Sequence, residues 1–177
     1  MEGAGIILDA FQRVQETLHS ALRDLTPEEL IQEPHPPIGW LAWRATRTQD
    51  SQVSRLSGEK HAWIDEGWHA RFNMPPVVSD YGTGLSHTRE QVAIFRSPSA
   101  QTLLDYHDVV FEHTNAYLLK VTPQELDREL DEPRFQPLPT VAVRLVSITV
   151  SMLQGTGQIL YLKGLHRRGG WFPREGY

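Results

Sequence analysis

The chain has 177 residues, of which 40% are hydrophobic, a formal net charge of −5 and a sequence pI of about 5.9. This length and composition predict a single globular domain over residues 1–177, and the acidic balance argues against nucleic acid as the main partner. The chain contains no cysteine, which excludes disulfides, thiolate metal sites and a cysteine nucleophile.

Membrane and export signals are not found in the sequence. No run of about 18 apolar residues occurs, so we expect no transmembrane helix and no membrane partner. The first residues, MEGAGIILDAFQRVQ, lack the basic start and apolar core of a signal peptide. The expected location is therefore the cytoplasm.

Four long helices are predicted in chain order from apolar residues that recur at spacings of three and four. The first covers Ile6 to Leu25. The second follows the loop EPHPPIG, beginning near Trp40 and stopping at Gly58. The third extends from Ser99 to Val121, and the fourth from about Thr140 to Leu165.

Short helices are predicted between the long ones. At Thr26 and Thr122 the sequences TPEE and TPQE combine a capping threonine, a proline at the first helical position and a glutamate at the third. Another short helix is expected from Ser86 to Phe95, after a loop from Phe72 to Gly84. Because alternating strand patterns are hard to find, we predict an all-α fold, namely a four-helix bundle with short connecting helices.

The eight histidines are the first candidates for a metal site. Ligands on one helix face need a spacing of three or four residues, but His107 and His113 are six apart, and His61 and His69 are eight apart. Histidines in predicted loops can still converge in space. The histidines in these loops are His35, His61, His69 and His87.

Two other patterns have simple structural interpretations. In His107-Asp108 and Glu112-His113, adjacent side chains point about 100° apart on a helix, so we expect an exposed polar face rather than catalytic pairs. Trp63 and Trp68 are candidate walls of a ligand pocket, but tryptophans of this kind more often anchor a loop onto the core.

The second helix carries unusual charged residues. Trp40, Arg44 and Arg47 lie along one stripe, and Asp50 follows one turn after Arg47. A buried arginine needs a partner, and Asp50 is better placed for Arg47 than for Arg44. Alternatively, Arg44 extends to the surface.

Gly155 and Gly157 lie inside the fourth predicted helix, in SMLQGTGQILYLKGL. A glycine within a helix costs about 1 kcal/mol relative to alanine. These two glycines therefore require an explanation from packing or from a site.

IGWLAWRATRTQDSQV and VRLVSITVSMLQGTGQILYLKGL resemble the DinB/YfiT-like superfamily, especially an actinobacterial-type DinB branch of unknown function. Gly67-Trp68, Arg71-Phe72 and Leu126-Asp127-Arg128 add to the likeness, which spans nearly the whole chain. The resemblance implies a four-helix bundle, often a homodimer. In many members three histidine-type ligands hold nickel or zinc, one on the second helix and two on the fourth. Relatives include thiol-dependent transferases and isomerases acting with mycothiol or bacillithiol, such as maleylpyruvate isomerase.

The ligand positions that the resemblance implies are occupied here by Arg44, Ser151 and Gly155. This set does not suit nickel or zinc, so we predict that the metal site is lost and that no metal cofactor is bound. In one interpretation Arg44 points into the former metal pocket, Gly155 gives it room and Ser151 accepts a hydrogen bond from it. Asp50 or Glu112 would then complete the pairing of Arg44.

In the other interpretation Arg44 leaves the bundle for solvent and Gly155 only permits close helix packing. We expect Gly157, which Gln158 follows, to let a neighbouring helix approach.

Three functions remain open: a metal-free binding protein or homodimeric module, a binder of a small anion such as a carboxylate through Arg44, and a metal-dependent thiol transferase or isomerase with other ligands. The sequence leaves open whether the protein is an enzyme.

Overall fold

The fold is all-α in a computed structural model that describes residues 3–34, 36–77, 84 and 86–169. Within these ranges the chain forms nine helices and no strand, with one isolated antiparallel bridge between Glu129 and Thr140. The predicted all-α class is confirmed. The four longest helices are α1 (Gly3–Leu22), α3 (Ile38–Ser57), α7 (Ala100–Leu118) and α9 (Val141–His166). The short helices are α2 (Pro27–Ile31), α4 (Ala62–Asp65), α5 (Trp68–Arg71), α6 (Arg89–Ile94) and α8 (Pro123–Asp127).

The predicted helix boundaries rest on local capping. Thr26 and Glu29 form a reciprocal capping box at α2, and Thr122 accepts a hydrogen bond from the Glu125 N–H at α8. Gly58 adopts a left-handed conformation with φ of 75° and ends α3, as predicted. Of the loop predicted from Phe72 to Gly84, residues 78–83 lie outside the described ranges.

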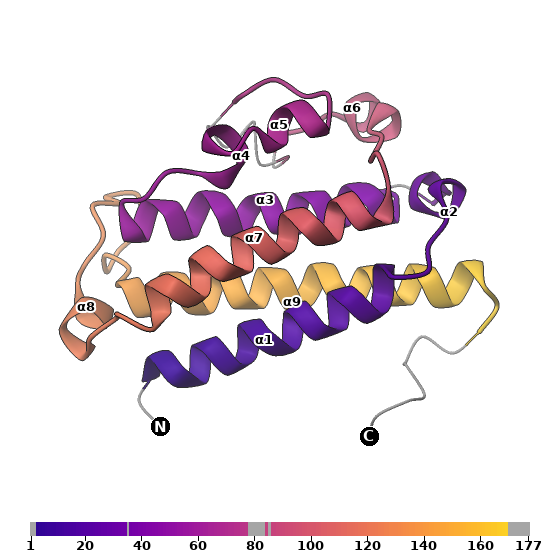
Figure 1. The fold of residues 1–177 in the computed structure, drawn as a ribbon. Coiled ribbons are helices and arrows are strands. Elements are labelled where there is room, and N and C mark those ends of the chain that lie inside the picture. Colours follow the sequence, from indigo (N-terminus) through magenta and orange to yellow (C-terminus); the bar gives the residue numbers. More distant parts are fainter. Residues whose placement is uncertain (1–2, 35, 78–83, 85, 170–177) are drawn as a thin grey trace.

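The four long helices pack into one bundle. α1 and α3 each contact both α7 and α9. Figure 1 shows that α1 and α9 run in one direction, while α3 and α7 run in the other. Because α3 and α7 are parallel neighbours, a long connection must cross the bundle between them. This crossover, residues 58–99, carries α4, α5 and α6 along one side of the bundle.

The crossover is attached by aromatic side chains. Trp63 and Trp68 are buried, and their ring centroids lie 5.6 Å and 5.2 Å from that of Tyr106 on α7. Trp63 also lies edge-on to Trp43 of α3, at 5.8 Å between centroids. The two crossover tryptophans therefore do anchor this segment onto the core, in agreement with the structural interpretation of their sequence pattern.

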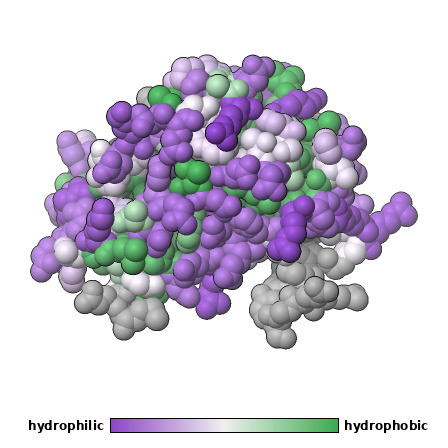
Figure 2. All heavy atoms as spheres, viewed as in Figure 1, coloured by the Kyte–Doolittle hydropathy of each residue, from purple (hydrophilic) through white to green (hydrophobic). Residues whose placement is uncertain are grey.

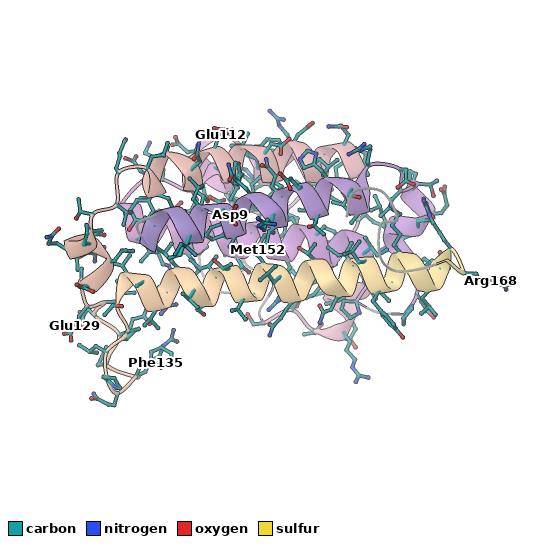
Figure 3. The ribbon with its side chains drawn as sticks, turned by 90° about the horizontal axis from the view of Figure 1, so that it is seen from below. Asp9, Glu112, Glu129, Phe135, Met152 and Arg168 are labelled. Atoms are coloured by element: carbon teal, nitrogen blue, oxygen red, sulfur yellow. The ribbon has the colours of Figure 1, made fainter. Side chains whose placement is uncertain are left out.

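α9 is the longest helix and forms one edge of the bundle, beside α1 (Figure 3). By length and composition alone it is apolar enough to cross a membrane, a test that the core helix of a bundle also passes. Its inner residues, including Leu145, Met152 and Ile159, are fully buried in the bundle.

The surface of the molecule is mostly polar on the face drawn in Figure 2. Hydrophilic side chains predominate there, and hydrophobic ones occupy small separate areas.

Candidate functional site

A small groove of about 170 Å³ lies between α3 and α9. α3 contributes Arg44, Thr48 and Gln52, which follow each other at four-residue spacing on one side of the helix. The facing α9 contributes Arg144 and Ser151, among others, and Ala45, Ile148 and Met152 supply apolar lining. The structure thus brings together Arg44 and Ser151, two positions that the family resemblance implied for one site.

Arg44 is half-buried in this groove. Its guanidinium carbon lies 5.6 Å from the ring centroid of Trp40, a cation–π distance. Burial lowers the pKa of Arg44. Within the described ranges it forms no ion pair and no hydrogen bond, so the expected bond to Ser151 is not present. Glu112 does not line the groove, and Figure 3 shows it on α7, across the bundle from α9.

The other charged residue of the groove, Arg144, is neutralised. It forms an ion pair with Glu132 and donates a hydrogen bond to Gln52 Oε1 at 3.1 Å. In contrast, the hydroxyl of Thr48 is buried and has no hydrogen-bond partner among the described residues. Within the described residues, the groove therefore presents one positive charge without an acidic partner and one buried hydroxyl without a hydrogen-bond partner.

The two glycines of α9 have different surroundings. A Cβ added to buried Gly155 would lie 3.4 Å from the Cβ of Ala45, so Gly155 lies at a close contact between α9 and α3. Its neighbour is Ala45 rather than Arg44, which corresponds to the packing interpretation. Gly157 is exposed, and a Cβ there would meet nothing within 4 Å. The neighbouring helix expected at Gly157 is not found in the described part of the chain.

Asp50 lies on a different side of α3 from the groove. Its Oδ1 accepts from the backbone N–H of Ala62 at 3.0 Å. Its Oδ2 accepts from the N–H of Trp63 at 2.9 Å and from the Tyr106 hydroxyl at 2.8 Å. Asp50 therefore caps α4 and fastens the crossover to α3 and α7. Burial, together with the nearby Asp50 charge, raises the pKa of Tyr106.

Arg47, rather than Arg44, is the arginine enclosed in the bundle. It is fully buried, and its Nη1 lies 3.6 Å from Asp50 Oδ2, the local pairing that the spacing predicted. Nη2 donates to the carbonyl of Val77 at 3.1 Å, and the guanidinium carbon lies 5.4 Å from the ring centroid of Trp63. This arginine is part of the crossover attachment and does not reach the α3–α9 groove.

His107 shows where the sequence interpretation was wrong. It is completely buried instead of exposed, with Nδ1 3.3 Å from Thr46 Oγ1 and Nε2 without a partner in the described structure. Burial lowers the pKa of His107 to about 4. A signal was present, because His107 lies four residues after Leu103 and three before Val110, on the apolar stripe of α7.

The groove does not fit a nickel or zinc ion. Its polar lining consists of guanidinium, hydroxyl and amide groups, whereas such ions need neutral imidazole, thiolate or carboxylate ligands. Across the described ranges, no group of three or more histidine, cysteine, aspartate or glutamate side chains is placed to hold a metal. Of the loop histidines, His35 lies outside those ranges. His61 lies against Arg47, and His87 accepts a hydrogen bond from the Trp40 indole.

Comparison with known proteins supports the resemblance seen in the sequence. A family model described as the DinB superfamily matches residues 10–146, a range that includes Arg44 but ends before Ser151. A crystal structure of a conserved protein from Enterococcus faecalis is similar, with a TM-score of 0.84 and 26% sequence identity, over 93% of this chain and 97% of that one. The curated proteins gave no match. Since the family model covers most of the chain, the protein belongs to the DinB superfamily.

Proposed function

We propose that this protein binds a small carboxylate in the groove between α3 and α9, at a site that has lost the divalent metal of many relatives. The proposal is carried by Arg44, which lines the groove and has no acidic partner within the described residues. A guanidinium offers two parallel donors that match the two oxygens of a carboxylate. Partial burial of Arg44 strengthens this attraction, because less water screens it.

The groove also limits the size and shape of the ligand. A volume of about 170 Å³ suits a molecule of a few non-hydrogen atoms, since one liquid water takes about 30 Å³. With the carboxylate on Arg44, the unpartnered hydroxyl of Thr48 offers a second polar contact. Ile148 and Met152 line the groove beside it and suit a short apolar group.

The first test is the metal content of the purified protein, measured by mass spectrometry. We expect far less than one nickel or zinc ion per chain. A stoichiometric metal would contradict the proposal and favour a metal-dependent thiol transferase or isomerase.

The second test is thermal unfolding with propionate, lactate or pyruvate. A ligand that binds only the folded state raises the melting temperature. We expect at least one of these carboxylates to do so for the wild type but not for Arg44→Gln. Arg55→Gln is the matched control, because Arg55 is exposed on the same helix and does not line the groove. An equal shift in wild type and Arg44→Gln would overturn the proposal.

We also propose that the protein forms a homodimer through the outer face of α9. Val143, Val146, Val150 and Leu153 are 45–56% exposed, and they recur at spacings of three, four and three residues, as in helices that pack together. No charged residue is exposed on α9 between Val143 and Leu162, whereas the exposed residues of α1 include Asp9 and Arg13.

A second copy is the occupant that this face suits best. The exposed apolar face of α9 carries no charges that would select a different protein as partner. In a homodimer, a two-fold axis places this face of one chain against the same face of the other. The open space around Gly157 would let the partner helix approach closely.

Light scattering during size-exclusion chromatography tests the dimer. The wild type should elute with the mass of two chains and Val150→Glu with the mass of one, while Gln12→Glu on α1 should leave the dimer intact. A wild-type protein that is monomeric at high concentration would contradict the dimer and leave the carboxylate site untouched.

A further inference from the structure

A second and larger pocket lies under the crossover, away from the α3–α9 groove. Its volume is about 390 Å³, within the range of small-molecule sites, and it shares no lining residue with the groove. Most of its wall is apolar or aromatic: Trp63, Phe72, Met74, Val77, Ile94 and Phe95. Such a lining favours an uncharged ligand, because a charge would lose its hydration on entry.

Trp63, one of the residues that line this pocket, carries a buried hydrogen-bond donor without an acceptor. Trp63 is 1% exposed, and its indole N–H is buried without an acceptor anywhere in the described structure. An unsatisfied buried donor costs about 1–3 kcal/mol. Trp63 is a lining residue of the pocket, so a small rotation of its ring would bring this N–H to an acceptor atom on a bound molecule.

The charged group at the pocket edge is already engaged. Arg96 donates from Nη1 to the carbonyl oxygens of Ala93 and Phe95, at 2.7 Å and 2.8 Å. His87 accepts from the Trp40 indole N–H at 3.1 Å through Nδ1, which requires that nitrogen to be unprotonated. Partial burial lowers the pKa of His87, which also favours its neutral form. The pocket therefore differs in kind from the groove at Arg44.

We propose that this pocket binds a compact, neutral aromatic molecule whose single acceptor oxygen accepts a hydrogen bond from Trp63 Nε1–H. The aromatic walls provide offset and edge-on contacts for a ring. A carbonyl oxygen supplies the acceptor. The site is independent of the carboxylate site and does not rest on it.

Trp68 provides an internal control. Its indole N–H is also buried without a partner, and its ring also packs on Tyr106, at 5.2 Å between centroids. However, Trp68 does not line the pocket, and the guanidinium of Arg71 lies 4.1 Å from its ring centroid. A ligand in the pocket should therefore affect the N–H of Trp63 and leave that of Trp68 unchanged.

The experiment is an NMR titration of the five tryptophan indole N–H signals, assigned with Trp63→Phe and Trp68→Phe. The probes are acetophenone and 2-phenylpropene. They have nearly the same shape, but the carbonyl oxygen of acetophenone is replaced by a CH₂ group in 2-phenylpropene. Acetophenone should shift the Trp63 signal and not that of Trp68. 2-Phenylpropene should bind about tenfold more weakly, because it cannot accept the hydrogen bond. Equal affinities, or an unmoved Trp63 signal, would overturn the proposal.

A surface variant keeps the test valid if Trp63→Phe fails to fold. Ile94 lines the pocket but is 73% exposed, so Ile94→Glu should fold and weaken acetophenone binding at least severalfold by placing a charge at the apolar wall. Leu119→Glu is the matched control, because Leu119 is 70% exposed and does not line the pocket. If Ile94→Glu binds acetophenone as tightly as the wild type does, the site is elsewhere. The same holds if Leu119→Glu weakens acetophenone binding as much as Ile94→Glu does. Arg44→Gln should leave acetophenone binding unchanged.

Discussion

Arg44 and Arg47 lie three residues apart on α3, yet the helix places them in different surroundings. Arg47 is completely buried beneath the crossover, 3.6 Å from Asp50 and hydrogen-bonded to the carbonyl of Val77. Arg44 lines the open groove against α9 and has no acidic partner among the described residues. The fold pairs the charge of Arg47, whereas the charge of Arg44 is the one that we propose for ligand binding.

This difference has an energetic reason. Removing one member of a buried ion pair leaves an uncompensated charge and typically costs about 3–5 kcal/mol. Changing a partly exposed cation that has no ion pair and only one aromatic contact alters stability less, by about 1 kcal/mol or less. The two sides of α3 should therefore respond very differently to substitution.

The largest effect is expected for Asp50→Ala. This change removes the acid beside Arg47 and the acceptor of two backbone N–H groups at the start of α4. We expect a loss of about 3–5 kcal/mol in the free energy of unfolding, measured with urea. Asp105→Ala on the exposed side of α7 is the control and should change stability by about 0.5 kcal/mol or less. A loss at Asp50 as small as that at Asp105 would show that the crossover does not depend on this carboxylate.

His107 should make the protein less stable in acid. Its pKa is about 4 in the folded state against 6.5 when unfolded, so between these values the unfolded chain binds more protons. Stability should fall as the pH drops from 6.5 to 4, by about 3 kcal/mol in all. His107→Gln should remove this part of the pH dependence, as measured by urea unfolding at several pH values. An unchanged slope in the variant would assign the acid sensitivity to other groups.

The α3–α9 contact can be tested with the two glycines of α9. Gly155→Leu should destabilise by about 1–3 kcal/mol, because a Cβ at Gly155 already lies 3.4 Å from Ala45. Gly157→Leu, two residues further along the helix, meets open space and should stabilise the monomer by about 1 kcal/mol through helix propensity. Urea unfolding of dilute protein would measure both. Similar effects at the two positions would mean that α9 does not pack as closely on α3 as the structure shows.

Local signals predicted much of the fold. The capping residues at Thr26 and Thr122, the stop at Gly58 and the apolar periodicity depend only on neighbours in the sequence. The sequence also brought Arg44 and Ser151 to one groove, through the resemblance to a family. It grouped Asp50 with them, although Asp50 follows Arg44 by six residues, which is about 240° around the helix and therefore a different side. The burial of His107 was missed because residue type was given more weight than its position on an apolar stripe.

The smallest effect on stability is expected at Arg44, where the comparison with Arg47 is most direct. Arg44→Gln removes no ion pair and no hydrogen bond with a described residue and loses only the contact with the Trp40 ring, so the free energy of unfolding should change by about 1 kcal/mol or less. Arg47→Gln leaves Asp50 buried without its cation and should cost several times more. Both variants are compared by urea unfolding, and Arg44→Gln also by carboxylate binding. If Arg44→Gln destabilises the protein as much as Arg47→Gln, Arg44 is a structural residue and the groove has no charge to offer a ligand.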